Sequence, residues 1–125
     1  MKRVYISGPI TKGDRNWNYY QACDMEAELM RRGFAPLNPM QTMVLPFAWD
    51  GEFEHEQWLA RDFAWIEVAD AILRLPGESV GADAECQFAK DRGIPVFDTI
   101  IEIEHWREFN CTFTRISQEI PEARP

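Results

Sequence analysis

Short apolar runs alternate with amphipathic segments along most of this chain. Short apolar runs bounded by glycine, proline or polar residues are typical of buried strands. The chain has four such runs, at residues 4–6, 34–37, 71–75 and 94–97. The segments between them place apolar side chains three or four residues apart, as an amphipathic helix does. This spacing predicts helices over residues 17–32, 54–68 and 79–92.

Strands that alternate with helices favour a parallel sheet with right-handed crossovers and helices on both faces. We therefore expect an α/β fold, a single-domain doubly wound parallel sheet of the flavodoxin-like or Rossmann-like type, over residues 1–125. The first strand is expected to be central. Residues 99–109 fit an amphipathic helix or an irregular strand and helix, and residues 112–120 are ambiguous. A frayed tail is expected over residues 121–125.

Residues 40–53 carry methionine, proline and aromatic side chains without a clear period. A connection of this length is long for a compact domain, and such loops often cover binding sites. Two interpretations stay open: a loop packed against the core, or a lid over a substrate. In the helix that follows, Trp58, Asp62 and Trp65 share one side, and both this side and the opposite one are expected to be buried.

Polar residues and glycines follow the first three predicted strands. Ser7 and Gly8 follow the first strand, Asn38 follows the second, and residues 76–81 follow the third. Because ligands bind at the carboxyl ends of strands in open α/β sheets, these segments are expected to form the active cleft. Ser79 and Gly81 open the next helix, whose free amides favour an anion. The structural alternative for Ser79 is a helix N-cap.

Two acids and one tyrosine are candidates for chemistry at this cleft. Glu85 lies in the first or second turn of the helix after Gly81, where it is either a nucleophile towards a sugar carbon or an ordinary acid that matches the helix dipole. Asp62 lies among aromatic residues, so it is either paired, for example with Arg61, or a proton donor with a raised pKa. Tyr5 either reaches the cleft or packs with its hydroxyl bonded.

Composition and net charge limit the kinds of ligand and partner that we expect. Hydrophobic residues make up 46% of the chain and charged residues 27%, which is typical of a folded globular protein. A formal net charge of −8 argues against binding a nucleic-acid polymer, although a mononucleotide needs only a few local donors. The three cysteines have no metal-type spacing, which fits buried reduced thiols. Since no His-x-x-x-His pair or clustered carboxylate spacing appears either, no metal site is expected. No leader and no apolar run long enough to span a membrane is visible, which predicts a cytoplasmic protein.

Several blocks of residues together resemble the nucleoside 2-deoxyribosyltransferase superfamily. The matching blocks lie within residues 1–98, at residues 5–10, 61–65, 69–70 and 79–96. The last block contains Ser79-x-Gly81-x-x-x-Glu85, followed by Gly93-Ile94-Pro95-Val96. The chain looks most like short phage and bacterial members of uncharacterised function, and it is also similar to the 2'-deoxynucleoside 5'-monophosphate N-glycosidases.

This resemblance implies a flavodoxin-like fold, no cofactor, and a dimer or larger homo-oligomer. It implies that Glu85 attacks the anomeric carbon to form a glycosyl-enzyme and that Asp62 acts as the acid towards the leaving base. Ser79 and Gly81 would hold the 5'-phosphate or 5'-hydroxyl. The sugar and base pocket would be lined by Ser7, Gly8 and Ile10. Tyr5 and Asn38 complete our set of candidate substrate-binding residues, and the small-molecule partner is a nucleoside or nucleotide.

Some alternatives remain open at this stage. Residues 11–13, Thr-Lys-Gly, stand where the similar monophosphate glycosidases carry an arginine, so a free nucleoside and a 5'-monophosphate are both candidate substrates. Water as acceptor makes a hydrolase, and a second base makes a transferase. The Pro-Gly pair before Gly81 is also similar to the loop of phosphoribohydrolases that release cytokinin-type bases. A non-catalytic nucleotide-binding module is the third reading.

Aromatic residues bear on assembly. Trp17, Tyr20 and Trp58 are spaced so that they either form an apolar interface between subunits or belong to the core of one chain.

Overall fold

The fold is built on one parallel sheet. The computed structural model describes the backbone of residues 1–118 and the side chains of residues 1–110, so the predicted tail lies outside the described residues. The strands, in the order β2-β1-β3-β4, all pair in parallel. Their bounds are β1 Arg3–Ser7, β2 Ala35–Leu37, β3 Ala71–Arg74 and β4 Val96–Phe97. The first strand is central, as predicted.

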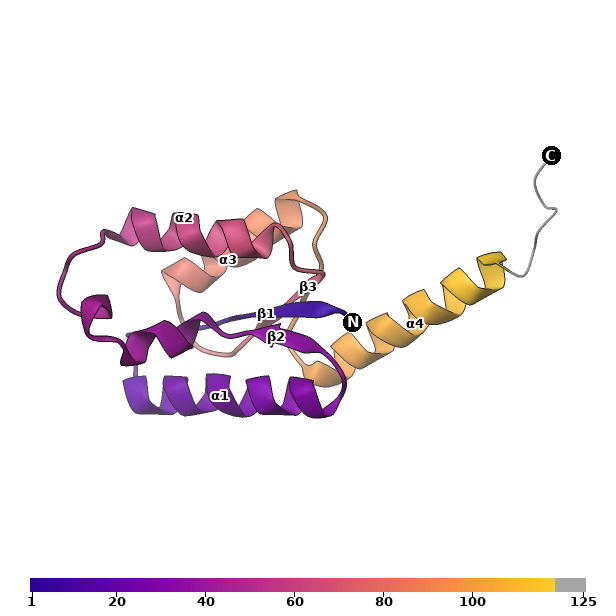
Figure 1. Cartoon of the computed structure of the whole chain (residues 1–125), viewed down its shortest axis with the longest axis horizontal. Coiled ribbons are helices and arrows are strands. Elements are labelled where there is room, and N and C mark those ends of the chain that lie inside the picture. The colour runs from indigo at the N-terminus through magenta and orange to yellow at the C-terminus, as the bar shows by residue number, and fades with distance from the viewer. Residues whose placement is uncertain (119–125) are drawn as a thin grey trace.

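Helices cover both faces of this sheet. They are α1 (Arg15–Arg31), α2 (His55–Ile66), α3 (Val80–Asp91) and α4 (Ile100–Gln118). In Figure 1, α2 and α3 lie on one side of the strands and α1 on the other, while α4 extends beyond the sheet. This arrangement confirms the predicted doubly wound α/β fold of the flavodoxin-like type. For residues 99–109 the helical alternative is correct, and the helix continues through residues whose pattern is ambiguous.

Helix boundaries follow from capping residues that the sequence supplies. The Asp14 side chain accepts hydrogen bonds from the backbone amides of Asn16 and Trp17 at 2.9 and 3.1 Å, so Asp14 caps α1. After α1, Gly33 has a φ of +85°, a left-handed conformation that suits glycine and ends the helix. Gly93 ends α3 in the same way, with a φ of +74°.

Strand alternation divides the apolar side chains into two layers. Val4 and Ile6 face α1 and α4, in a core that also holds Leu29, Leu73 and Ile103. Tyr5 faces the opposite way, towards α2 and α3, in a second core formed with Ile66, Ile72, Cys86 and Ala89. Side chains two residues apart on a strand share a face, so Ser7 also points towards the α2–α3 layer. This places two hydroxyl groups beneath α3.

Three aromatic side chains of α1 and α2 are largely exposed, and one of them, Trp65, differs from expectation. Trp65 is 53% exposed, although both apolar sides of its helix were expected to be buried. It lies at the end of α2 beside the short edge strand β2, where the sheet leaves an open apolar cavity of about 460 Å³ that Trp65 and Val68 line. On α1, Trp17 and Tyr20 are 63% and 65% exposed, so neither belongs to the core.

The loops after β1 and β3 are in direct contact, and this contact requires two glycines. A Cβ atom on Gly8 would lie 2.9 Å from Cβ of Leu75, and one on Gly77 would lie 2.9 Å from Cγ of Pro9. Gly77 also has a φ of +116°, which is strained for other residues. The Leu75 amide donates to the Ser7 carbonyl at 2.7 Å and extends the pairing of β1 with β3 into these loops. The close approach fixes the start of α3 against the end of β1.

Candidate active site

A cavity of about 410 Å³ opens at the carboxyl ends of β1 and β3. Its walls come from the β1–α1 loop, from residues 39–54, which we call the covering segment, and from α2 and the start of α3. The predicted site residues among its lining are Gly8, Ile10, Asp62, Ser79, Gly81 and Glu85. The cleft predicted from the strand ends is therefore present, with both candidate catalytic acids in its wall.

Glu85 lies in the cavity wall, with two hydroxyl donors on its carboxyl group. Ser7 Oγ donates to Glu85 Oε1 at 2.6 Å, and Tyr5 Oη donates to Oε2 at 3.0 Å. Both donors are essentially inaccessible to solvent, and Glu85 is 7% exposed. The alternation of β1 explains the pair of bonds, since Tyr5 and Ser7 share the face on which α3 packs. Together the two bonds fix both carboxyl oxygens.

Burial and a neighbouring acid change the proton affinity of Glu85. Removal from water and contact with the Asp62 carboxyl raise the pKa of Glu85 to about 8, against the smaller opposing effect of the Ser7 and Tyr5 bonds. Burial and the nearby Glu85 charge also raise the pKa of Tyr5, so its hydroxyl stays protonated as a donor. At neutral pH the Glu85 carboxyl therefore keeps its proton, next to Asp62.

Asp62 lies between Glu85 and an arginine of its own helix. Arg61 donates from Nε and Nη2 to Asp62 Oδ1, at 3.0 and 2.8 Å, so the paired alternative for Asp62 is confirmed. Arg61 Nη1 also donates to Thr42 Oγ1 at 3.1 Å, and the guanidinium carbon lies 4.8 Å from the centre of the Trp58 ring. Arg61 thus contacts the acid, the covering segment and an aromatic wall of the cavity.

The start of α3 forms the opposite end of the cavity. Ser79 is the N-cap of α3, since its Oγ accepts from the Ala82 amide at 3.0 Å, and it lines the cavity at the same time. His55, the first residue of α2, lies beside Gly81, with its Cε1 4.0 Å from the position of a Cβ there. At the rim, Lys12 Nζ pairs with Glu78 Oε1 at 3.0 Å, and both side chains are largely exposed.

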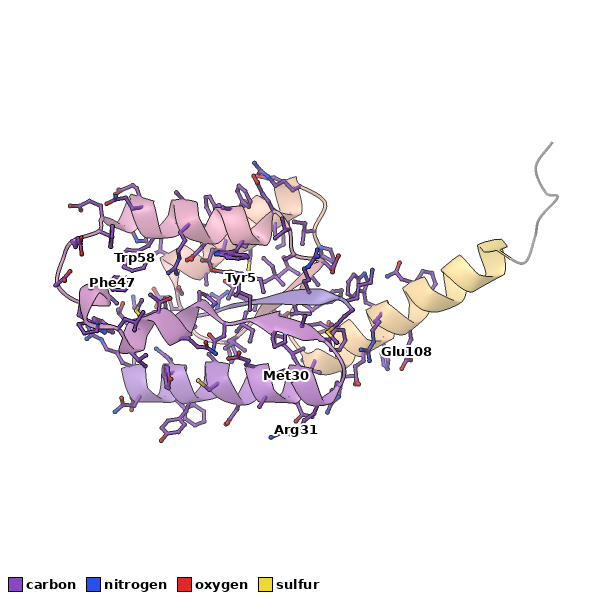
Figure 2. All side chains as sticks on the ribbon, viewed as in Figure 1. Tyr5, Met30, Arg31, Phe47, Trp58 and Glu108 are labelled. Carbon is purple, nitrogen blue, oxygen red and sulfur yellow. The ribbon has the colours of Figure 1, made fainter. Side chains whose placement is uncertain are left out.

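The covering segment folds as two short 3-10 turns, Pro39–Val44 and Pro46–Ala48, which lack the period of a regular helix or strand. Phe47 stacks on Trp58 with ring centres 6.2 Å apart, and Phe53 meets the same ring edge-on at 5.7 Å. Figure 2 shows Phe47 and Trp58 side by side where the segment meets α2. Met43 and Trp49 of the segment line the cavity, so the segment forms one of its walls.

Three predicted substrate-binding residues do not line this cavity. Tyr5 and Ser7 lie behind Glu85: their hydroxyls bond to its carboxyl group, and Glu85 separates them from the cavity. Figure 2 shows Tyr5 between β1 and the α2–α3 layer. Asn38 is buried against α1, where its Nδ2 donates to Glu26 Oε1 at 3.2 Å and its Oδ1 accepts from the Met40 amide at 3.0 Å. The structure thus places Asn38 apart from the other predicted site residues.

Several polar and aromatic residues that line the cavity were not among the site residues predicted from the sequence. They are Lys12, Trp49, His55, Trp58 and Arg61. The sequence signal for Arg61 is its position next to Asp62. His55 has a weaker signal, because the start of a helix after a long loop is the position that comes closest to the preceding strand ends. No pattern in the covering segment indicates which of its aromatic side chains faces inwards.

Within the part of the chain that the structure describes, no group of three or more histidine, cysteine, aspartate or glutamate side chains is placed to hold a metal ion. Over the same residues, none of the helices has the length and apolar character needed to cross a bilayer.

The raised pKa of Glu85 makes a prediction for stability. In the unfolded chain a glutamate titrates at about 4.3, whereas burial and the Asp62 carboxyl raise the pKa of Glu85 in the folded chain to about 8. Between these values the folded chain binds more protons than the unfolded one, so the free energy of unfolding falls as pH rises. The contribution of Glu85 is complete below the lower value and is lost as pH rises through the upper one.

Glu85→Gln has no proton to lose, so its stability should lack this decline. Near pH 9 we expect the variant to be more stable than the wild type by more than about 1 kcal/mol, and this advantage to shrink towards pH 5. Urea unfolding of both proteins across this range measures the difference. Parallel pH profiles for the two proteins would contradict a raised pKa at Glu85.

Comparisons with solved structures give the same fold. A conserved protein from Enterococcus faecalis V583 has a TM-score of 0.59 at 20% identity, over 77% of this chain and 61% of that protein. A 2-deoxyribosyltransferase from Bacillus psychrosaccharolyticus has a TM-score of 0.57 at 21% identity, over 75% of this chain and 69% of that protein. A 2-desoxiribosyltransferase from Leishmania mexicana has a TM-score of 0.55 at 20% identity, over 78% of this chain and 63% of that protein. The chain thus matches only about two thirds of the length of these proteins.

These structures confirm, at the level of the fold, the resemblance to nucleoside 2-deoxyribosyltransferases that the sequence motifs predicted. A search of curated proteins finds no match to this chain. The model of a family described as a domain of unknown function, DUF4406, matches residues 2–98, which include all four strands and every predicted site residue. The chain therefore belongs to the DUF4406 family.

Proposed function

We propose that this protein cleaves or transfers at the N-glycosidic bond of a nucleoside, a deoxynucleoside or a 5'-monophosphate of either, through a covalent glycosyl intermediate on Glu85. The observation that carries the proposal is the pair of carboxyls, Glu85 and Asp62, in the wall of a cavity of about 410 Å³. The similarity to solved 2-deoxyribosyltransferases supports the same class of reaction.

In the first step, the ionised Glu85 carboxylate attacks the anomeric carbon of the sugar. The bond between that carbon and the base nitrogen breaks, and its electron pair leaves with the base. Before the attack, the proton that burial keeps on Glu85 passes to the neighbouring Asp62, which leaves Glu85 as the carboxylate. Asp62 then delivers this proton to the base nitrogen, so the base departs neutral. Ser7 and Tyr5 hold the Glu85 carboxyl in one orientation during the attack.

In the second step, water or a second base attacks the same carbon and displaces Glu85. With water as acceptor, the proton that it loses returns to Asp62 and the product is the free sugar or sugar phosphate. Two displacements in sequence retain the configuration of the anomeric carbon.

The other walls of the cavity suit different parts of a nucleoside. The aromatic side, with Trp49 and Trp58, suits a planar base, because aromatic rings stack on one another. The start of α3, with Ser79 and Gly81, suits the 5' end of the sugar, because amides and hydroxyls there can donate hydrogen bonds to a phosphate or a hydroxyl oxygen. The exposed Trp17 and Tyr20 of α1 support assembly into a homodimer or larger homo-oligomer.

The proposal is tested by base release from a panel of ribo- and deoxyribonucleosides and their 5'-monophosphates, with and without an acceptor base, followed by chromatography. We expect release from at least one class of substrate, and exchange of bases if the protein is a transferase. Activity confined to ribonucleoside monophosphates would favour the phosphoribohydrolase alternative. Binding of a nucleotide without release anywhere in the panel would overturn the proposal in favour of a non-catalytic binding module.

A further inference from the structure

Arg61 makes three contacts that no other side chain of the cavity combines among the described residues. Its Nε and Nη2 lie 3.0 and 2.8 Å from Asp62 Oδ1, its Nη1 lies 3.1 Å from Thr42 Oγ1, and its guanidinium packs on Trp58. Asp62 belongs to the acid pair and Thr42 to the covering segment. The side chain therefore joins the group that protonates the base to the segment that would contact it.

We propose that Arg61 is a positioning residue that sets the charge state of the Asp62–Glu85 pair and, through Thr42, links that pair to the covering segment. This inference rests on the proposed function for its consequence in catalysis, but the linkage itself belongs to the ligand-free protein. Two properties of arginine are involved, a fixed positive charge and a planar fork that bonds two partners at once.

The charge acts on the carboxyl pair. Arg61 is the cation bonded to Asp62, and two neighbouring carboxyls keep a proton to higher pH when no cation offsets their repulsion. The other charged or titratable groups around the pair are Tyr5 of β1, which donates to Glu85, the buried Cys86 of α3, which follows Glu85, and Lys12 and His55, which line the same cavity. Lys12 is engaged by Glu78 at the rim, so Arg61 is the cation in direct contact with the pair.

The fork acts on the covering segment. The Thr42 hydroxyl is bonded to the same guanidinium as Asp62, and Met43, the next residue, lines the cavity. A substrate base that pushes the covering segment aside would therefore also move the Thr42 hydroxyl, which is bonded to Arg61. Because Arg61 also packs on Trp58, the position of the base against this wall is coupled to the orientation of Asp62. The consequence is that the fit of the base influences delivery of the proton.

Three variants separate the two properties. Arg61→Met removes charge and fork, Arg61→Lys keeps the charge but cannot bond Asp62 and Thr42 as a planar fork, and Thr42→Val removes only the bond to the covering segment. The first readout is the pH profile of kcat/KM. Without the cation the pair keeps its proton to higher pH, so the alkaline limb of Arg61→Met should move up by about one unit or more. The alkaline limb of Arg61→Lys and of Thr42→Val should lie at the same pH as that of the wild type.

The second readout is the ratio of kcat/KM for a purine and a pyrimidine substrate. Loss of one hydrogen bond corresponds to about two- to tenfold, and we expect a change of this size in the ratio for both Thr42→Val and Arg61→Lys. A purely structural role would lower all rates in proportion, with neither a shifted limb nor a changed ratio, and that result overturns the inference. Thermal unfolding of each variant shows whether it is folded.

A titration without substrate distinguishes failure of this inference from failure of the proposed function. The Glu85 carboxyl is followed by carbon-13 nuclear magnetic resonance in the ligand-free wild type, Arg61→Met and Arg61→Lys. We expect the midpoint of Arg61→Met to be higher by about one pH unit or more and that of Arg61→Lys to match the wild type. If the wild type releases no base but the midpoints separate in this way, the charge role stands without the proposed function. If the Glu85 carboxyl titrates with the same midpoint in all three proteins, the charge role of Arg61 is overturned, whether or not the wild type releases base.

Discussion

Replacement of Glu85 by glutamine is expected to lower kcat/KM for base release at least about 1,000-fold, because the amide cannot act as the nucleophile. Glutamine has the size of glutamate and can still bond to Ser7 and Tyr5, whose hydroxyls accept as well as donate. The loss should therefore appear in kcat, with a bound substrate still detectable by calorimetry.

Asp91→Asn is the matched control for this variant. Asp91 lies at the other end of α3, is exposed and accepts only a surface bond from Gln87 at 2.9 Å. The same replacement of one carboxyl by an amide on the same helix should leave kcat/KM within about twofold of the wild type. Turnover by Glu85→Gln at a rate close to that of the control would remove Glu85 from the role of nucleophile.

Replacement of Asp62 by asparagine should lower kcat/KM by about 100- to 10,000-fold, the range of general acid catalysis. Asparagine keeps the shape of the side chain and can accept from Arg61, but it has no acidic proton for the departing base. The loss is expected to depend on the base, since a base that is stable as an anion needs little help from an acid.

Rates for the variant and the wild type across several bases of different acidity therefore test the role of Asp62. The deficit should be greatest for the most basic leaving groups and should shrink for the most acidic ones. An equal deficit for every base would assign Asp62 to substrate positioning instead of proton transfer, and an unchanged rate would remove it from the site.

Much of the fold follows from patterns in the sequence. The apolar runs at residues 4–6 and 71–75 predict the two central strands because a buried parallel strand needs apolar side chains on both faces. The helix predicted over residues 17–32 matches α1, Arg15–Arg31, to within two residues, since helix ends depend on local capping by residues such as Asp14 and Gly33. These features depend on neighbours in the sequence, so the sequence alone predicts them.

The features that the sequence did not predict depend on contacts between distant segments. Trp65 has the spacing of a buried residue, but its exposure depends on the short length of β2. The side chain of Asn38 follows a strand like the other candidates, yet it is bonded to Glu26 of α1. The 3-10 turns of the covering segment have no amphipathic period for a sequence to reveal.

The candidate site shows the same division. Glu85 and Asp62 were predicted as candidates from their positions on helices and from a family resemblance, and both line the cavity. The bonds from Tyr5 and Ser7 to Glu85 join residues 80 and 78 positions apart, so no local pattern predicts them. The contact of Arg61 with Thr42 is of the same kind, with a separation of 19 residues.

The most direct test of the central claim is the mass of the protein during turnover. A 2'-fluorinated nucleoside slows release of the sugar from an enzyme, because fluorine destabilises positive charge at the anomeric carbon. Intact-mass spectrometry of the wild type after reaction with this compound should find an added mass equal to the sugar without its base, and peptide mapping should locate it on Glu85. Two results would contradict the account. One is release of the base, from the fluorinated compound or from the natural substrate, without any adduct on the protein. The other is an adduct on a residue other than Glu85.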